Sequence, residues 1–381
     1  MTKKLYDLDS HLSVFSAQVL ACDPAGEGRW QILLDQTAFF PEGGGQLPDQ
    51  GTLDQANVLD VQEAGPDILH TTDAPLTVGT SVTGTLDWPL RFRRMQCHSG
   101  EHIVSGTAHS LYGCTNVGFH LGENEVILDF DKELSQEQLD TIETIANQVI
   151  WENRPVLAEY PAPAVLRDLE YRSKLDLTEN VRIVTIPGCD VCACCAPHVN
   201  ATGEIGVIKL LSSMRHRGGI RIWMAAGQMA LEDYRTKQGN VAAISAALSV
   251  KQHETAQGVA RMKQELEAAY LALKEARQAL AAEKCRNLPE TEGNLLLFEE
   301  DLDSQSMRTL VNAGMEKCSG VCAVFVGKDG QYRHVMGSKH VDLRAKSREI
   351  HQALGGKGGG QPTMILGTVT TSRKEIEAYF G

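Results

Sequence analysis

Two histidines, His98 and His102, stand four residues apart in the segment MQCHSGEHIVSG at 95–106. Residues at this spacing lie on one face of an α-helix, with side chains about 5–6 Å apart. The pattern of the segment favours a helix, although Gly100 and Gly106 weaken that prediction. One divalent metal ion would accept both imidazoles.

The remaining ligands must come from elsewhere, because zinc takes three protein ligands when it keeps a water and four when it is structural. The segment GCDVCACCAPH contains several cysteines before His198, and Cys194 and His198 are again four residues apart. Any one of these side chains on its own is more often buried or hydrogen-bonded within the protein than bound to a metal. Two such pairs in one chain favour a metal site made of His98, His102, Cys194 and His198.

The ten cysteines do not indicate a secreted disulfide framework, because the chain is long and its first residues include no apolar signal region. No apolar run approaches the roughly 18 residues that a membrane span needs. We therefore expect a cytoplasmic protein whose cysteine cluster binds metal or carries reactive thiols.

Length and charge limit the classes of protein further. A chain of 381 residues with 42% apolar and 22% charged residues is expected to form two or three soluble domains. The net charge of −13 argues against a protein that coats nucleic acid indiscriminately. Residues 328–374 contain nine basic and three acidic residues, a net charge of +6, which suits one docking place for a polyanion.

The overall pattern predicts an α+β protein that begins with a β-barrel at residues 1–90. Within that barrel the segment PEGGGQ contains Gly43, Gly44 and Gly45 in succession, followed by Gln46. Consecutive glycines allow positive φ angles and let a ligand approach the backbone. A simple hairpin turn is the alternative, and this stretch alone slightly favours it.

Residues 91–226 are expected to form an α+β core that contains the histidine helix. An amphipathic helix is predicted from Ser135 to Glu152, with Ser135 and Gln138 as its cap pair. A strand at 181–186 then leads to the cysteine cluster.

Residues 227–288 are rich in Ala, Glu, Lys, Gln and Leu and are expected to form a helical coiled-coil linker. The apolar stripe needs a partner, either residues 228–238 folded back across Gly239 and Asn240, or a second subunit. The stripe follows steps of three and four and consists of Val259, Met262, Leu266, Ala269, Leu273, Ala276 and Leu280.

Residues 289–381 resume α/β alternation, with helices predicted at 304–317 and 342–354 and strands at LLLFEE, VCAVFVGK and ILGTVT. The segment GGKGGGQP is not a Walker A loop, because Lys357 is followed by glycine. Its amides and Lys357 could cradle phosphates after a helix, and a flexible loop is the alternative.

Four landmarks in a fixed order now identify a resemblance that covers nearly the whole chain. They are LDQTAFFPEGGGQLPDQG at 34–51, HSGEH at 98–102, CCAPHVNATGEIG at 194–206 and GGKGGGQP at 355–362. The chain resembles the long form of the AlaX alanyl-tRNA editing proteins, which are related to the editing and C-Ala domains of alanyl-tRNA synthetase.

The resemblance implies one zinc ion per chain on His98, His102, Cys194 and His198, and a C-terminal tRNA-binding domain. The middle of the second motif departs from the synthetase form CGGTH, since Cys195, Ala196 and Pro197 stand there. The other residues that it implies are Thr37, Gly43, Gly44, Gly45 and Gln46 at the substrate, His120 in place of a pocket glutamine, and Arg344, Lys357, Gly358 and Gly359 at the tRNA.

The implied activity is hydrolysis of the ester that joins a wrong amino acid, serine first and glycine second, to alanine tRNA. Glu101 is a candidate general base, although a glutamate on a helix usually faces solvent.

HSGEH also fits the HxxEH pattern of inverzincin peptidases, which predicts a downstream Glu as third ligand. A tRNA-binding protein with structural zinc is another alternative. Threonyl-tRNA editing domains share the two-part metal pattern, but PEGGGQ and GGKGGG favour the alanine system. The partner expected is mischarged alanine tRNA. A homodimer through the helical and C-terminal region is one alternative, and an intramolecular hairpin would cover the apolar stripe equally well.

Overall fold

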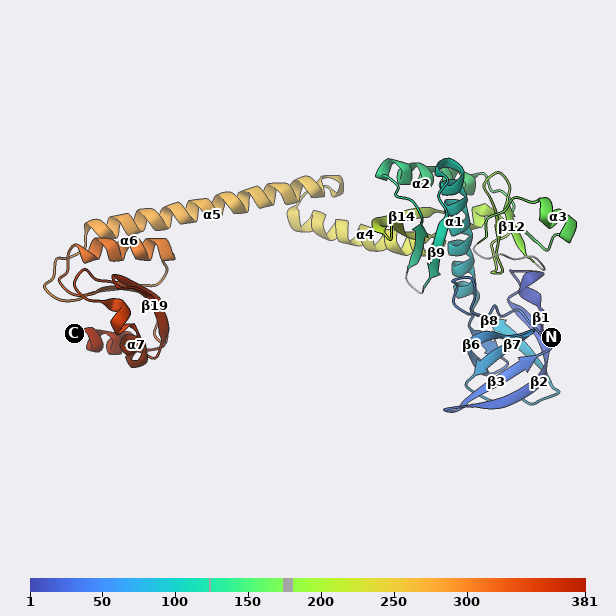
Figure 1. The fold of residues 1–381 in the computed structure, drawn as a ribbon, viewed down its shortest axis with the longest axis horizontal. Coiled ribbons are helices and arrows are strands. Elements are labelled where there is room, and N and C mark those ends of the chain that lie inside the picture. Colours follow the sequence, from blue (N-terminus) through green and yellow to red (C-terminus); the bar gives the residue numbers. More distant parts are fainter. Residues whose placement is uncertain (123–124, 174–180) are drawn as a thin grey trace. The chain divides into compact units, whose positions relative to one another are not determined.

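The computed structural model describes residues 1–122, 125–173 and 181–381. The chain divides into two compact units, Met1–Ala242 and Ala243–Gly381. Both mix helices and strands, so the predicted α+β class is confirmed (Figure 1). No helix among the described residues is both long and apolar enough to cross a membrane.

The chain begins with a closed barrel of strands in the order β2-β3-β7-β6-β5-β8. Alternate side chains along these strands are buried, as β8 illustrates with its strict exposed-buried pattern. A short parallel pair, β1 (Lys3–Lys4) and β4 (Gln36–Thr37), lies beside the barrel strands. The barrel strands are β2 (Val14–Gly26), β3 (Arg29–Leu34), β5 (Gly51–Leu53), β6 (Ala56–Ala64), β7 (Asp67–Thr72) and β8 (Ser81–Leu86).

The PEGGGQ segment forms a tight turn between β4 and β5. Gly43 and Gln46 exchange backbone hydrogen bonds of 3.1 and 3.0 Å, and Gly44 and Gly45 have φ of 60° and 82°. The hairpin-turn reading is therefore confirmed. A Cβ on Gly45 would lie 2.6 Å from the carbonyl oxygen of Phe119, so the turn must be glycine to approach the next part of the fold.

The core that follows is organised on helix α1 (Trp88–Tyr112), which carries both histidines (Figure 1). Asp87 caps its first turn by accepting from the Leu90 N–H at 3.1 Å. Helix α2 (Gln136–Trp151) begins with the predicted capping box of Ser135 and Gln138. Both helices share a hydrophobic core with the sheet β14-β15-β10-β9. Its strands are β9 (Asn116–Leu121), β10 (Val126–Phe130), β14 (Ile208–His216) and β15 (Gly219–Ala226).

The two glycines that weakened the helix prediction for α1 lie where other segments come closest to it. A Cβ on Gly100 would lie 3.1 Å from the Ala226 Cβ of the sheet. A Cβ on Gly106 would lie 2.5 Å from the carbonyl oxygen of Cys189 and 2.7 Å from the Asp190 Cβ. Glycine costs helix stability, roughly 1 kcal/mol relative to alanine, but here it allows the close packing that the site needs.

A second, smaller sheet carries the chain to the cysteine cluster. Its order is β11 (Leu157–Glu159), β12 (Ile183–Ile186), β13 (Asp190–Ala193), with helix α3 (Pro163–Asp168) before β12. The predicted strand at 181–186 is confirmed as β12, whereas β13 was not predicted.

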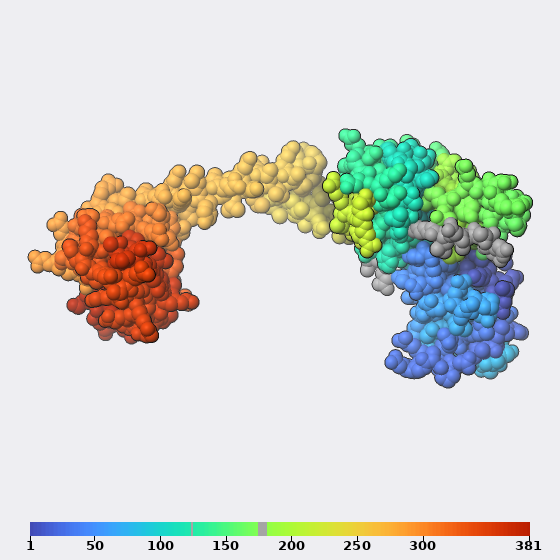
Figure 2. Space-filling view, viewed as in Figure 1, coloured from blue at the N-terminus to red at the C-terminus, as the bar shows by residue number. Residues whose placement is uncertain are grey.

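A buried arginine joins the barrel to the core. Arg91, in the first turns of α1, is fully buried and donates from Nε to Asp49 Oδ2 at 2.9 Å and from Nη2 to the Ala38 carbonyl at 2.6 Å. Asp49 Oδ2 also accepts from the Phe40 N–H at 2.7 Å. Ala38, Phe40 and Asp49 flank the PEGGGQ turn, so Arg91 fixes that turn relative to α1. Figure 2 shows the barrel, in blue, in contact with the core.

The helical segment consists of α4 (Gly227–Leu248) and α5 (Thr255–Arg286). Of the two alternatives for covering the apolar stripe, the fold-back at Gly239 and Asn240 is wrong, because α4 continues through both residues. Nothing lies within 4 Å of the position that a Cβ on Gly239 would take, so close packing does not require a glycine there. The stripe residues on α5 are exposed in the single chain; for example, Leu266 is 68% exposed.

The second unit ends in a five-stranded sheet of order β16-β17-β18-β20-β19. The flexible-loop alternative for GGKGGGQP is wrong, because Lys357–Gln361 forms the edge strand β19, paired antiparallel with β20. Glycine is required inside this pair, since a Cβ on Gly358 would lie 2.4 Å from His351 Nε2. The elements are β16 (Leu295–Glu299), α6 (Ser304–Met315), β17 (Cys322–Lys328), β18 (Gln331–Gly337), α7 (Leu343–Ala353), β19 (Lys357–Gln361), β20 (Met364–Val369) and α8 (Arg373–Phe380).

The barrel contains a titratable group that makes its stability depend on pH. His70 is fully buried, with its Nε2 2.8 Å from Thr37 Oγ1, and burial lowers its pKa to about 4. The unfolded chain therefore binds a proton from about pH 6.5 downward, while the folded barrel does not until about pH 4. We therefore expect the free energy of unfolding to fall by about 3 kcal/mol as the pH drops from 6.5 to 4.

Thermal unfolding of the wild type and of His70→Gln between pH 7 and pH 4 checks this expectation. The variant should lose less stability on acidification than the wild type. Identical pH dependence of the two proteins would show that His70 does not set the acid limit of the barrel.

Candidate metal centre and its cavity

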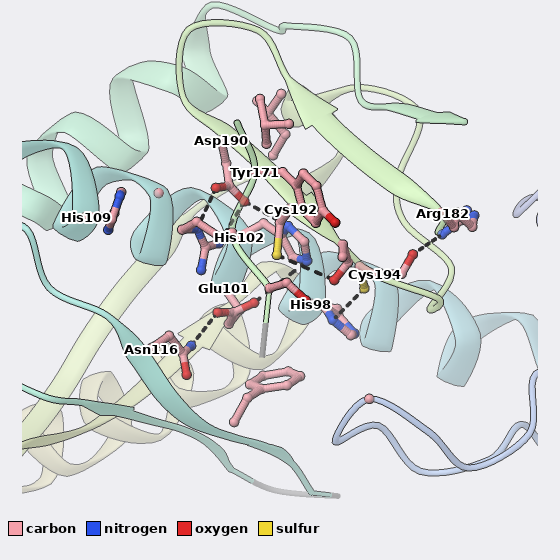
Figure 3. A pocket seen from close by; sticks show the side chains of 18 of the residues that line it. His98, Glu101, His102, His109, Asn116, Tyr171, Arg182, Asp190, Cys192 and Cys194 are labelled. Atoms are coloured by element: carbon pink, nitrogen blue, oxygen red, sulfur yellow. Dashed lines mark hydrogen bonds and ion pairs between the residues drawn. The ribbon is translucent and has the colours of Figure 1, made fainter. Parts of the chain in front are cut away.

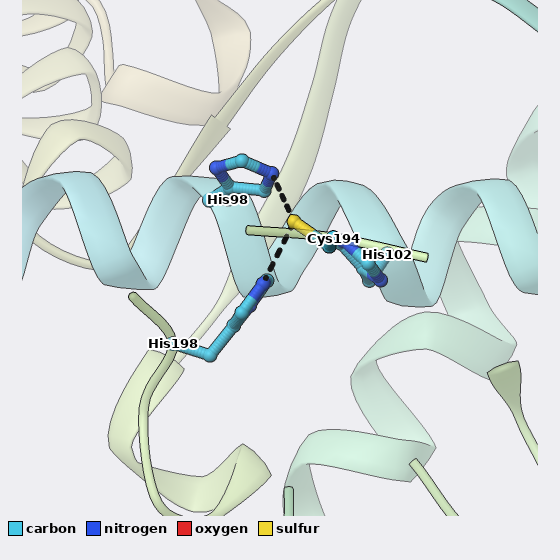
Figure 4. A group of neighbouring side chains, drawn as sticks. All are labelled: His98, His102, Cys194 and His198. Carbon is cyan, nitrogen blue, oxygen red and sulfur yellow. Dashed lines mark hydrogen bonds between the residues drawn. The ribbon is translucent and has the colours of Figure 1, made fainter. Parts of the chain in front are cut away.

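Two segments far apart in the chain bring four metal-ligating side chains together. His98 and His102 project from α1, and Cys194 and His198 follow β13 (Figure 4). One ligand atom from each lies within 4.8 Å of all the others. Cys194 Sγ lies 3.5 Å from His98 Nε2 and 3.4 Å from His198 Nε2. The structure therefore groups all four residues that the spacing indicated.

Each imidazole of this group is oriented through its other ring nitrogen. The Nδ1 atom of His98 lies 2.9 Å from Gln46 Oε1, and that of His198 lies 3.0 Å from Ser99 Oγ. The Nδ1 of His102 lies 3.0 Å from Asp190 Oδ2. With Nδ1 engaged, the Nε2 lone pairs are free to face one point, which is the arrangement found around protein-bound metals.

The charges around the group favour a bound cation. Burial alone would raise the pKa of the Cys194 thiol, but the neighbouring His98 and His198 lower it well below its usual value. Burial lowers the pKa of His198 to about 3, so its imidazole is neutral. For His102, burial would lower the pKa, but the hydrogen bonds to Asp190 and Cys194 and the nearby thiol groups together outweigh it and raise the pKa. A thiolate together with the Nε2 atoms of three imidazoles, which bind a metal in their deprotonated form, is a donor set that fits Zn²⁺.

Asp190 is itself held by a buried ion pair. Arg172 donates from Nε to Oδ1 at 2.7 Å and from Nη2 to Oδ2 at 2.8 Å. Burial alone would raise the pKa of the Asp190 carboxyl, but hydrogen bonds from His102 and Arg172 lower it. Asp190 therefore stays ionised and keeps the His102 ring in one orientation.

The loop that carries Cys194 is fixed by another arginine. Arg182 Nη1 donates to the carbonyl oxygens of Cys194 at 3.1 Å and Ala196 at 2.8 Å. Ser10 Oγ in turn donates to the His198 carbonyl at 2.7 Å. These bonds hold the CCAPH loop without the threonine of the synthetase form.

We call His98, His102, Cys194 and His198 the metal group. Its members His98, His102 and Cys194 line a cavity of about 1180 Å³. This volume exceeds the roughly 300–1,000 Å³ that is usual for small-molecule sites. The wall includes the aromatic side chains of Phe119, Tyr160 and Tyr171 and the basic side chains of Arg172 and Arg182. Aromatic and basic groups together are what a single-stranded nucleotide end requires.

Glu101 also faces this cavity. It is 5% exposed, and its Oε2 lies 3.9 Å from His102 Nε2, the nitrogen that points into the metal group. The usual expectation of a solvent-facing glutamate is therefore wrong for this residue.

The predicted substrate residues do not all reach the cavity. Gly44 and Gly45 line it, whereas Gln46 is buried against His98. Thr37 and Gly43 are not among the described residues that line it. The Thr37 hydroxyl instead lies 2.8 Å from His70 Nε2 inside the barrel.

His120 is exposed on β9 and is not one of the described residues that line the cavity. Its neighbour Phe119 faces His98, with ring centroids 4.8 Å apart. Successive strand residues point to opposite faces, so His120 points away from the cavity, and the catalytic role expected for it stays a prediction.

The predicted tRNA residues lie in the second unit. Arg344 is exposed on α7, which packs against β19. Lys357 and Gly358 are exposed on β19, and Gly359 is partly exposed.

Sequence reasoning missed the residues that support the ligands, namely Ser99, Asp190 and Arg172. The only signal was position, since Ser99 lies inside HSGEH and Asp190 lies inside GCDVCACC.

Two family models match parts of the chain. One describes the threonyl and alanyl tRNA synthetase second additional domain and matches residues 181–222. The other describes class II (A) tRNA synthetases and matches residues 12–90.

Curated relatives match nearly the whole chain. The alanyl-tRNA editing protein Aarsd1 of Rattus norvegicus is 28% identical over 97% of this chain and 95% of its own length. The alanine–tRNA ligase of Ignicoccus hospitalis is 29% identical over 99% of this chain, and that of Natronomonas pharaonis is 32% identical over 96%. The chain spans 42% of the length of each of these two ligases.

One solved structure, the C-Ala domain from Aquifex aeolicus alanyl-tRNA synthetase, is 23% identical and covers 24% of this chain and 89% of that domain. Its TM-score is 0.21, so this match carries no argument about the fold.

Asp190 gives a direct test of how the ligand His102 is supported. Asp190→Asn removes the charge that orients His102, and we expect the affinity for Zn²⁺ to fall about 10- to 100-fold. Competition with a chromophoric chelator measures it.

The matched control is Asp129→Asn, which breaks a carboxylate–Arg221 pair of 2.7 Å in the same core but touches no ligand. Equal Zn²⁺ affinity of the two variants would contradict the role given to Asp190.

Proposed function

Because this chain resembles the alanyl-tRNA editing proteins and the related part of alanine–tRNA ligases along nearly its whole length, we propose that it is an editing hydrolase. It would release the wrong amino acid from mischarged alanine tRNA, with Ser-tRNA(Ala) as first substrate and Gly-tRNA(Ala) as second. The observation that carries this proposal is the convergence of His98, His102, Cys194 and His198, the first three of which line the cavity.

In this proposal the four side chains hold one Zn²⁺ per chain, and the ion would take a water or the ester carbonyl either as a fifth ligand or in place of one of the four. Bound in this way, zinc would lower the pKa of the water to about 7 and polarise the carbonyl. Asp190, Gln46 and Ser99 keep the imidazoles in place. Glu101 would accept a proton from the attacking water through Oε2, as a general base. The walls of the cavity would enclose the terminal nucleotides and exclude bulk water.

The backbone of the PEGGGQ turn supports a place for the amino acid. Gly44 and Gly45 line the cavity on the barrel side and have no side chains to fill it. A small aminoacyl group would therefore contact the backbone of these two glycines.

The composition of the ligand group argues against the peptidase alternative. An inverzincin takes a glutamate as its third ligand, whereas the group here is completed by Cys194 and His198. A tRNA-binding protein with purely structural zinc would use the same four residues, and the activity measurement separates it from an editing enzyme.

Single-turnover deacylation of Ser-tRNA(Ala) and Ala-tRNA(Ala) tests the proposal. Zinc-loaded wild type should release serine and spare alanine. Cys194→Ala should lower the rate of serine release by about 100-fold or more, because metal stabilisation of the transition state is worth several kcal/mol.

Cys195→Ala is the matched control, since it removes the adjacent thiol but none of the four ligand atoms. It should release serine at close to the wild-type rate. If the zinc-loaded wild type binds tRNA tightly but releases neither amino acid, the metal is structural and the editing function is rejected.

We propose that the second unit binds the tRNA through β19 and α7. The edge strand β19 exposes backbone and Lys357, and the adjacent α7 exposes Arg344. Lys357→Ala and Arg344→Ala should each weaken tRNA binding and reduce the slope of log K against log salt by about 1, as one phosphate contact is lost.

Binding titrations at several salt concentrations measure both quantities. Lys263→Ala, which removes an exposed charge from α5, is the control and should leave the slope unchanged. An unchanged slope in the Lys357 and Arg344 variants would reject this tRNA contact.

We also propose that the chain forms a homodimer through α5. The apolar residues of α5 are exposed in the single chain, with Met262 at 51% and Leu273 at 47% exposed. A second copy of the helix would cover such a stripe in the manner of a coiled coil.

A further inference from the structure

The carboxylate of Glu101 is held at one oxygen by two neutral donors. Ser105 Oγ donates to Glu101 Oε1 at 2.5 Å, one turn farther along α1. Asn116 Nδ2, from the start of β9, donates to the same oxygen at 2.6 Å (Figure 3). Both bonds go to Oε1, and Oε2 is the oxygen that lies 3.9 Å from His102 Nε2.

The orientation of the Asn116 amide is fixed by its other contacts. Its Oδ1 accepts from the Gly118 N–H at 3.1 Å, so Nδ2 must point to Glu101. A carboxylate can only accept, which agrees with this assignment. Asn116 Nδ2 also lies 3.0 Å from Ser105 Oγ, which closes a three-residue network.

All three side chains are buried: Glu101 is 5% exposed, Asn116 4% and Ser105 0%. Glu101 and Asn116 also line the cavity beside the metal group. Hydrogen bonds in such surroundings are strong and directional, because little water competes for them.

The chemical nature of the partners is also informative. Nearby Arg172 donates hydrogen bonds to Asp190, and the hydrogen bonds that Glu101 accepts from Asn116 and Ser105 come from an amide and a hydroxyl. An arginine or lysine partner would neutralise the carboxylate. Amide and hydroxyl donors fix its direction and leave its charge.

We propose that Asn116 and Ser105 are positioning residues, which act through Glu101 by turning its Oε2 toward the metal group and the reacting ester. This inference rests on the proposed editing function for its kinetic consequence. Its structural content, a single orientation of Glu101 imposed by two donors from α1 and β9, is independent of the substrate.

The first test is structural. Crystal structures of zinc-loaded Asn116→Ala and Ser105→Ala should show Glu101 rotated or in several conformers, while the wild type shows one. An unchanged single conformer of Glu101 in both variants would overturn the proposal, whether or not the protein deacylates tRNA.

The second test is kinetic and uses Ser-tRNA(Ala). Asn116→Ala should lower kcat about 10- to 100-fold, the loss expected from a misplaced catalytic group, with KM within about twofold of the wild type. The variant should still bind one Zn²⁺ per chain. Since Asn116 acts only through Glu101, adding Asn116→Ala to Glu101→Gln should lower kcat no further.

Asn147→Ala is the matched control. Asn147 is a buried asparagine of the same core, and its Nδ2 donates to the carbonyls of Glu143 at 2.8 Å and Ile208 at 2.9 Å. This variant loses a comparable amide but should keep the wild-type kcat.

Independent, multiplicative losses from Asn116→Ala and Glu101→Gln would overturn the proposal, because they would show that Asn116 does not act through Glu101. A zinc-loaded wild type that releases no serine would reject the proposed function instead, and the crystal structures would then decide the positioning role alone.

Discussion

The site depends on one constraint, which is that the Nε2 atoms of three imidazoles must face the same point as a thiolate. Spacing on α1 places His98 and His102 on one face but does not set the rotation of either ring. The Nδ1 partner of each ring sets its rotation. Gln46 in the barrel turn orients His98, Asp190 on β13 orients His102, and Ser99 on α1 orients His198. The metal group therefore forms only when barrel, core and cysteine loop are assembled.

The close contacts around α1 follow from this requirement. Gly106 lets the Cys189–Asp190 backbone touch the helix, and this contact brings Asp190 to His102. On the barrel side, the buried Arg91 fixes both flanks of the PEGGGQ turn, which carries Gln46 to His98. Removing one partner from a buried ion pair such as Arg91 and Asp49 typically costs about 3–5 kcal/mol. The pair thus couples the stability of the barrel to the geometry of the ligands.

In the proposed function, the same architecture brings the metal ligands and the candidate base to one cavity. The three imidazoles and their Nδ1 partners are buried, and Glu101 and Asn116 are buried beside them where they line the same cavity as His98 and His102. The two glycines of the turn face that cavity from the barrel side. A rigid centre next to a large open space suits a reaction on the end of a long substrate, because only that end needs to enter.

Much of this arrangement could be predicted from the sequence because it is local. Spacings of four residues gave the ligand pairs, the Ser135 cap gave the start of α2, and the glycine run gave the turn at 43–46. What failed depends on contacts distant in sequence. The strand β19 exists because β20 pairs with it and His351 packs beneath Gly358, although glycine has little intrinsic preference for strands. The side of β9 on which His120 lies could not be predicted, because it follows from strand register. Asp190 and Asn116 were missed because only tertiary packing brings them to α1.

X-ray absorption at the zinc edge of the metal-loaded protein tests the central claim most directly. The account predicts a first shell with one sulfur at about 2.3 Å and nitrogen ligands at about 2.0–2.1 Å, with the sulfur signal lost in Cys194→Ala. A shell without sulfur, or one with several sulfurs from the cysteine cluster, would contradict it.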